Sequence, residues 1–94
     1  VDGVGRVRSV QAEGEGKRIW IDPPVELLRY IVEKGSIAVQ GTSLTVAAVD
    51  EDGFAVALIP HTLAETTLGT LAAGDLVNLE ADVLAKYVEK LLPR

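Results

Sequence analysis

The sequence contains no cysteine, and only four of its 94 residues are aromatic. Without cysteine there can be neither a disulfide framework nor a thiolate metal site, and such a composition suits the reducing cytoplasm. With so few aromatic side chains, the core must consist mainly of Val, Ala, Leu and Ile. The apolar runs are also far shorter than the roughly 20 residues that cross a bilayer. We therefore expect a soluble, cytoplasmic protein with an aliphatic core.

Basic residues are few and scattered. Nine Lys and Arg stand against fourteen Asp and Glu, which gives a net charge of -5. No basic patch is available to neutralise a phosphate backbone, so nucleic acid is not an expected partner. Ninety-four residues suit one small domain. Because the chain opens at Val1, without an initiator Met and inside an apparent strand, we expect it to be a piece of a longer protein.

Alternating residues and turn signals predict a mostly antiparallel protein. The stretch 4–11 alternates, Gly14–Gly16 supplies a turn, and 18–21 is β-branched and apolar, which together indicate a hairpin. Asp50–Gly53 is a second strong hairpin turn. The expected strands are 4–11, 18–21, 36–40, 43–49, 54–59 and 76–80. Six short strands favour a closed or nearly closed barrel, in which a ligand would sit at the mouth or against another subunit.

Two helices are expected beside these strands. Asp22 is a possible N-cap for a helix that tolerates Pro23 and Pro24 in its first turn and continues to Gly35. Residues 66–71 favour a turn or a short helix. Residues 82–94 form an amphipathic stripe after Asp82, a possible N-cap, so we divide the chain into a barrel over 1–81 and a helix over 82–94. That helix could pack on the barrel or pair with copies of itself.

The candidate site centres on the stretch from Lys34 to Thr45, KGSIAVQGTSLT. Ser43 and Thr45 are two residues apart, so on a strand they share a face, while Leu44 takes the other. Hydroxyls at this spacing could hold a heterocycle or a polyol, although a surface pair is the simpler explanation. Lys34 could bind a phosphate or a carbonyl, or serve a helix dipole. We interpret this stretch and 58–62 as two walls of one pocket.

Other reactive residues give weak signals. His61 is the only histidine and could act as a general base, but no nucleophile is spaced to it and one histidine cannot hold zinc. Asp82 could serve as an acid-base group or simply as a helix cap. Gly3 and Gly5 lack the spacing and the following helix of a dinucleotide-binding loop.

Taken together, six short motifs resemble the lumazine-binding repeat of riboflavin synthase. In order along the chain they are VDGVG (1–5), KGSI (34–37), GTSLTV (41–46), LIPHT (58–62), TTLG (66–69) and VNLE (77–80), followed by Asp82. The likeness spans nearly the whole chain. The stretch AKYVE at 85–89 resembles the second, C-terminal repeat of that family rather than the first.

The resemblance implies a six-stranded Greek-key barrel with one short internal helix and a C-terminal helix. It also implies an enzyme that transfers a four-carbon unit between two molecules of 6,7-dimethyl-8-ribityllumazine, yielding riboflavin and a diaminopyrimidine without metal or redox cofactor. In this family the site lies between the N-terminal barrel of one subunit and the C-terminal barrel of another, within a homotrimer. These 94 residues alone should then be inactive. The alternatives are a noncatalytic lumazine or flavin antenna protein and a barrel whose terminal helix serves only oligomerisation.

The family's functional positions carry over residue by residue. The catalytic positions that the resemblance implies are Ser43, Thr45 and Asp82. The ligand-binding positions are Val1, Lys34, Ser43, Leu44, Thr45, Ile59, Pro60, His61, Thr62, Leu63 and Ala64. Two departures stand out. The Gly-His pair that precedes Val1 in the family is absent, and Gln40 replaces the usual aspartate, which keeps hydrogen bonding but loses the charge.

Overall fold

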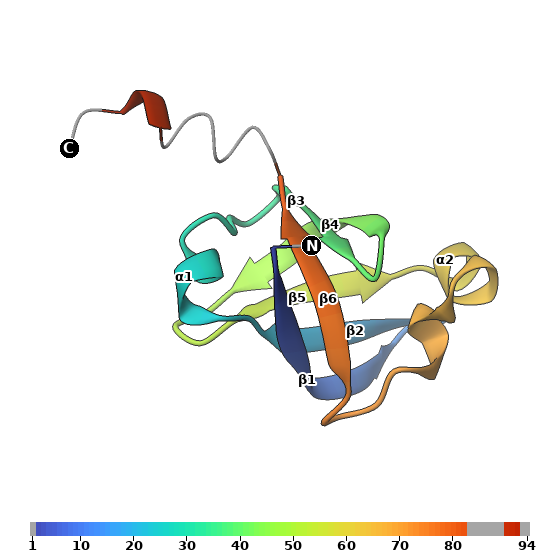
Figure 1. Cartoon of the computed structure of the whole chain (residues 1–94). Coiled ribbons are helices and arrows are strands. Elements are labelled where there is room, and N and C mark those ends of the chain that lie inside the picture. Colours follow the sequence, from blue (N-terminus) through green and yellow to red (C-terminus); the bar gives the residue numbers. More distant parts are fainter. Residues whose placement is uncertain (1, 83–89, 93–94) are drawn as a thin grey trace.

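The protein is a closed barrel of six antiparallel strands (Figure 1). The computed structural model describes residues 2–82 and 90–92. The elements in chain order are β1 (Gly3–Glu13), β2 (Gly16–Asp22), α1 (Val25–Leu28), β3 (Ser36–Val39), β4 (Thr42–Val49), β5 (Phe54–Leu58), α2 (Pro60–Glu65), the 3-10 turn η1 (Thr67–Thr70) and β6 (Leu76–Ala81). The predicted six-stranded antiparallel barrel is therefore confirmed.

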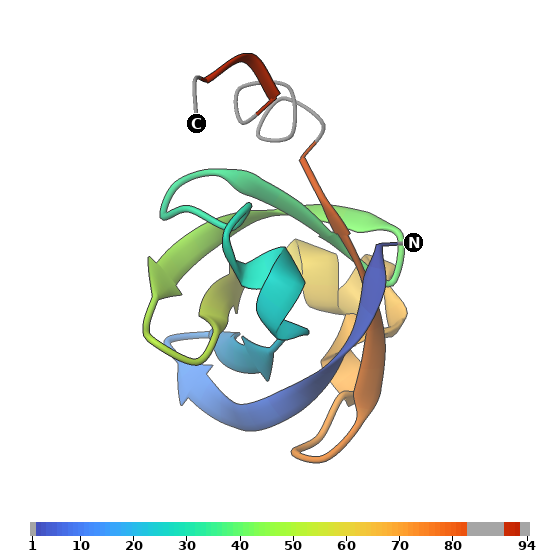
Figure 2. The ribbon, with the colours of Figure 1, turned by 60° about the vertical axis from the view of Figure 1, so that its left-hand side comes forward.

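Closure of the barrel depends on β6. The strand order around the ring is β1-β2-β5-β4-β3-β6, so β6 pairs with β1 on one edge and with β3 on the other (Figure 2). A closed ring leaves no edge strand for pairing with another chain. Because β6 is the last strand in the described part of the chain, the ring closes only when β6 pairs with β1 and β3, which lie far from it in the sequence.

Inward-facing aliphatic side chains fill the barrel, as the composition predicts. The aromatic Phe54 and the bulky aliphatic Ile19 and Ile21 are at most 1% exposed. The other buried hydrophobic residues of the strands are Val7, Ile37, Val39, Val46, Ala55, Val56, Leu58, Val77, Leu79 and Ala81. Truncating a buried aliphatic or aromatic side chain to Ala typically costs about 2–5 kcal/mol. The interior is therefore a packed core, and a ligand must bind outside it.

The helical segments differ from the sequence prediction. α1 has four residues and follows an N-cap at Pro24, so the expected helix from Asp22 to Gly35 is wrong. Asp22 instead ends β2, because the residue before a proline is biased away from helical geometry. Ile31 still points into the core, at 6% exposure. α2 is an internal helix that was not predicted, in addition to α1, and η1 confirms the turn or short helix expected within 66–71.

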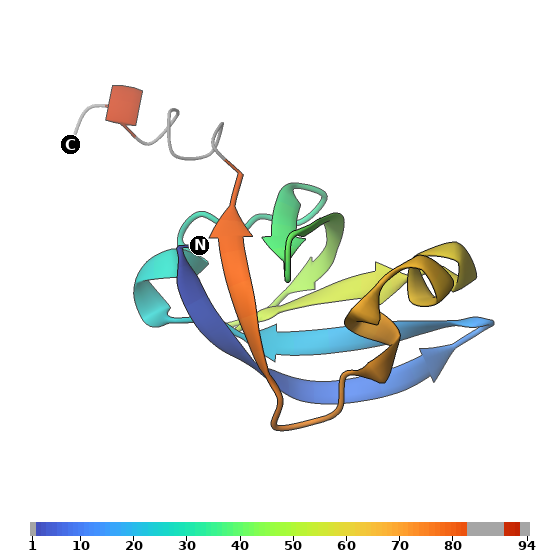
Figure 3. The ribbon, with the colours of Figure 1, turned by 45° about the vertical axis from the view of Figure 1, so that its right-hand side comes forward.

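The helical segments cover opposite ends of the barrel. Figures 1 and 3 show α1 at one end and α2 with η1 at the other, beside the tip of the long β1-β2 hairpin. Lys17 of β2 donates from Nζ to the carbonyl oxygen of Gly69 at 3.1 Å, which ties this hairpin to η1. Leu27 of α1 and Leu68 of η1 insert into the core. Both ends are thus closed to a ligand.

A charged cluster links β1, β2 and the turn between β4 and β5. Arg8 donates from Nε to Asp22 and from Nη1 to Asp50, both at 2.8 Å, and its guanidinium lies 5.1 Å from the centre of the Trp20 ring. The pKa of Arg8 is raised, chiefly by its hydrogen bond to Asp50 and then by that to Asp22. The pKa of Asp50 is lowered, chiefly by the hydrogen bond from Arg8. The cluster fixes the Asp50–Gly53 turn against β1.

The C-terminal helix predicted over 82–94 falls mostly on residues outside the described part of the chain, so it stays a prediction. β6 ends at Ala81, where the sequence placed the end of the barrel. Within residues 2–82 and 90–92, no helix has both the length and the apolar character needed to span a membrane.

Candidate ligand-binding groove

An open cavity of about 210 Å³ lies on the outer wall of the barrel, at the rim where β6 ends. Its lining residues come from β3, β4 and the end of β6. They are Ser36, Ile37, Ala38, Ser43, Glu80, Ala81 and Asp82, and we call this cavity the β3/β6 groove. The sequence placed Ser43 and Asp82 at the site, and in the structure both line this cavity, from opposite sides of β3.

Strand register explains why residues so far apart in the sequence meet here. Ser36 pairs with Thr45 and Ala38 with Ser43 across the β3-β4 ladder. On the other side of β3, Ala38 pairs with Glu80. Side chains of directly paired residues lie on the same face, about 4.5–5.5 Å apart at Cβ. One row across the outer wall therefore runs from Ser43 through Ala38 to Glu80.

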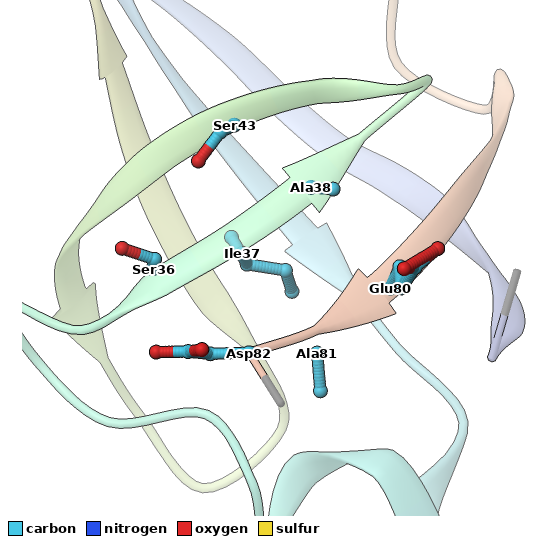
Figure 4. Close-up of a pocket in the computed structure, with 7 residues that line it drawn as sticks. All are labelled: Ser36, Ile37, Ala38, Ser43, Glu80, Ala81 and Asp82. Carbon is cyan, nitrogen blue, oxygen red and sulfur yellow. The ribbon is translucent and has the colours of Figure 1, made fainter. Parts of the chain in front are cut away.

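The neighbouring row holds the second half of the groove. Ile37 pairs with Ala81, so the register places Asp82 beside Ser36, on the side away from Thr45. Ile37 and Ala81 also line the groove, although their side chains are buried in the core, at 1% and 7% exposure. Figure 4 shows Ser36 and Asp82 toward one end of the groove, Ser43 across β3 from Asp82, and Glu80 on the side of β6.

The backbone at both ends of β3 is unusual. Lys34 and Gln40 have positive φ values of 69° and 52°, in the left-handed region that side-chain-bearing residues seldom adopt. At the far end, Gln40 and Gly41 form the two central residues of the tight β3-β4 hairpin, which positive φ at both positions allows. Such strain persists where surrounding structure enforces it and often marks functional regions. Both residues flank the strand that forms the centre of the groove.

The structure places the other predicted residues of the first wall as follows. Thr45 shares the outward face with Ser43, as predicted, but does not line the cavity. Leu44 packs against the core, so only its backbone could reach a ligand on this face. Lys34 is exposed and its backbone N–H donates to the carbonyl oxygen of Val46 at 2.8 Å, which extends the β3-β4 ladder beyond Ser36. Its ammonium is outside the groove lining.

The second predicted wall lies beyond the end of β5. Val46 pairs with Val56, so the antiparallel β5 runs toward the start of β4, where Ser43 lies. Ile59 follows β5 and is 60% exposed, which leaves an apolar side chain available beside that end of β4. Pro60 begins α2, His61 is exposed and Thr62 is half-buried. None of these four residues lines the β3/β6 groove.

Three further predicted positions cannot be placed against the groove. Val1 lies outside the described residues, and of Leu63 and Ala64 only the backbone, within α2, is described. Conversely, sequence reasoning missed Ser36, Ala38 and Glu80 as lining residues. The signal for Ser36 and Ala38 was the alternation of β3 opposite Ser43, but finding Glu80 required the non-local pairing of β3 with β6.

The groove offers two hydroxyls, two carboxylates and the methyl group of Ala38. Hydroxyls donate and accept, and ionised carboxylates accept from hydroxyl or imide N–H groups, so the set suits an uncharged polar ring or a polyol. Among the residues that the structure describes, no three His, Asp or Glu side chains gather as metal ligands would. At about 210 Å³ the groove is smaller than the roughly 300–1,000 Å³ of most ligand pockets. A second surface must complete it to enclose a larger molecule.

Fold and groove together define a small antiparallel barrel that presents a polar ligand site on its outer wall. The matching family is the Lumazine binding domain, over residues 1–82. The chain belongs to this family.

Curated relatives are riboflavin synthases. That of Photobacterium phosphoreum is 45% identical over 92 residues, covering 98% of this chain and 42% of its own length. That of Mycobacterium bovis is 47% identical over 95 residues, covering 98% of this chain and 47% of its own length. The chain therefore spans less than half the length of these relatives.

Solved structures share the fold. LumP complexed with flavin mononucleotide superposes with a TM-score of 0.82 at 26% identity, over 87% of this chain and 46% of that one. LumP complexed with 6,7-dimethyl-8-(1'-D-ribityl) lumazine gives a TM-score of 0.81 at 27% identity, again over 87% of this chain and 46% of that one.

Proposed function

We propose that this chain is the C-terminal half of a riboflavin synthase. In that role the β3/β6 groove holds one molecule of 6,7-dimethyl-8-ribityllumazine, which exchanges a four-carbon unit with a second molecule to give riboflavin and a diaminopyrimidine. The observation that carries the proposal is the convergence of Ser36, Ser43 and Asp82 on one outer groove. Relatives that are 45–47% identical over 98% of the chain support it.

The side chains suit distinct tasks in this reaction. Ser43 can donate to a ring atom and pass a proton between the ligand and water, while Asp82, in the same groove, can accept from a ring or ribityl group. Thr45 and Lys34 extend the same side of β4 and β3 and would support the ribityl chain. Ile59 and the start of α2 would cover the ring from the side of β5. Val1, His61, Leu63 and Ala64 complete the proposed contact set.

The small volume of the groove supports an assembly in which a second barrel closes the site. A bicyclic ring with a five-carbon chain needs more enclosure than about 210 Å³ supplies. A second barrel facing this wall would both close the site and bring the second reacting ring against the first, which lowers the entropic part of the barrier. We assign that surface to an N-terminal repeat in a neighbouring subunit, within a cytoplasmic homotrimer held by the helix predicted over 82–94.

The test is a turnover assay on the full-length protein and on this chain alone. Full-length protein mixed with 6,7-dimethyl-8-ribityllumazine should form riboflavin, detected by its fluorescence, whereas the 94 residues alone should bind riboflavin weakly and turn over negligibly. Full-length protein that binds the lumazine without forming riboflavin would instead indicate an antenna-type carrier. Failure to bind either molecule would refute the assignment and leave an oligomerisation barrel.

A further inference from the structure

The end of β6 is held on one edge by an aspartate side chain in place of a strand. Asp2 donates its backbone N–H to the carbonyl oxygen of Leu79 at 2.8 Å, and its Oδ2 accepts from the backbone N–H of Ala81 at 2.8 Å. β1 begins at Gly3, so the N–H of Ala81 lies beyond the last backbone pair of that ladder. The carboxylate therefore extends the β1-β6 ladder by one hydrogen bond.

The opposite edge of β6 is held in a similar way. Gln40 follows β3, and its backbone N–H donates to the carbonyl oxygen of Asn78 at 2.9 Å. Its Oε1 accepts from the backbone N–H of Asn78 at 2.5 Å. Here too a side-chain oxygen replaces a strand carbonyl at the point where backbone pairing ends.

These two acceptors bracket the part of β6 that builds the groove. The two acceptors bind the N–H groups of Asn78 and Ala81. Glu80 lies between these two residues, and Asp82 directly follows Ala81. A strand end whose N–H groups turn to water frays at little cost, since local opening begins where backbone hydrogen bonds are exposed. Loss of the Asp2 acceptor would let the end of β6 move away from β3 and carry Asp82 with it.

We propose that Asp2 is a positioning residue for the ligand site, acting through the Ala81 N–H to hold Asp82 and Glu80 opposite Ser36 and Ala38. This inference rests on the proposed function of the groove. It assigns a role to a carboxylate whose oxygen accepts from the backbone N–H of Ala81, a groove-lining residue, and it predicts that the acceptor oxygen, rather than the charge, carries the effect.

The experiment compares three variants of the full-length protein. Asp2→Ala removes the acceptor, Asp2→Asn keeps an acceptor oxygen without the charge, and Asp75→Ala is a matched control. Asp75 Oδ2 also accepts from a backbone N–H, that of Ala72, at 2.8 Å, but in the turn before β6 and away from the groove. Riboflavin affinity is measured by flavin fluorescence, stability by urea unfolding, and opening of β6 by hydrogen–deuterium exchange of peptides covering 76–81.

Asp2→Ala should weaken riboflavin binding about tenfold, the factor that one lost charge-assisted hydrogen bond supports, and speed exchange at the end of β6. Asp2→Asn should recover binding to within about threefold of the original protein. Asp75→Ala should lower stability comparably while leaving affinity unchanged. Equal affinities for Asp2→Ala and Asp75→Ala, or an Asp2→Asn variant as weak as Asp2→Ala, would overturn the inference. An original protein that does not bind riboflavin would refute the proposed function itself.

Discussion

Replacing Ser43 with Ala separates binding from proton transfer at the groove. Ser43 is exposed on β4 and points out of the barrel, so the fold should keep its stability within about 0.5 kcal/mol. One neutral hydrogen bond is worth about 0.5–1.5 kcal/mol, which limits the loss of ligand affinity to about tenfold. A positioned proton-transfer group contributes about 10²–10⁴-fold to rate. Turnover of the full-length protein should therefore fall at least about 100-fold, well beyond the loss of affinity.

Ser36→Ala is the matched control for this variant. Ser36 lines the same groove and carries the same hydroxyl, but it sits on β3, in the row that leads to Asp82. Its removal should lower affinity by a similar factor and leave turnover at saturating substrate within about threefold. Single-turnover riboflavin formation gives the chemical rate, and fluorescence titration gives affinity. Equal turnover for the two variants would remove Ser43 from the proton-transfer role.

Three further predictions concern the groove, the charged cluster and a turn. Ala38→Trp should fill the groove and weaken riboflavin binding at least about 100-fold, with unfolding in urea little changed; a variant that binds normally would place the ligand elsewhere. The pKa of Asp50 is lowered by Arg8, so its stabilisation is complete above the unfolded pKa of about 4 and is lost progressively as pH falls from there toward the lower folded pKa. Asp50→Asn should accordingly shrink the stability difference between pH 7 and pH 3, and an unchanged difference would contradict this linkage. Gly53→Ala would drive a methyl group into a carbonyl oxygen of β2 and should destabilise the fold by more than about 2 kcal/mol. In the control Gly14→Ala the added methyl group meets no atom within 4 Å, so this variant should cost about 1 kcal/mol. Similar urea midpoints for the two variants would contradict this packing argument.

Local patterns predicted the strands because each has a period of two and a turn signal at its end. The alternation through β1, the alternation through β6 and the Asp50–Gly53 turn are each contained in a short continuous stretch, and the structure has all three. The position of Ser43 on the outward face follows from the same rule. What a strand exposes can therefore be derived from the sequence once its ends are known.

Other features depend on contacts that no local pattern contains. Ile31 has helical spacing relative to Leu27, yet packing over the barrel end, rather than a continuous helix, buries it. Glu80 joins the groove only because β6 closes the ring against β3. No local pattern in the sequence predicts that the side-chain oxygen of Gln40 accepts from the backbone N–H of Asn78. The resemblance implies an aspartate at this position, and an amide oxygen can accept from the same N–H without a charge.

A crystal structure of the full-length protein with riboflavin tests the central claim most directly. The account predicts the flavin ring against the outer wall of β3, with a ring atom within hydrogen-bonding distance of the Ser43 hydroxyl and Asp82 facing the ligand. A ring seated on another face of this barrel, with the β3/β6 groove left open to solvent, would contradict it.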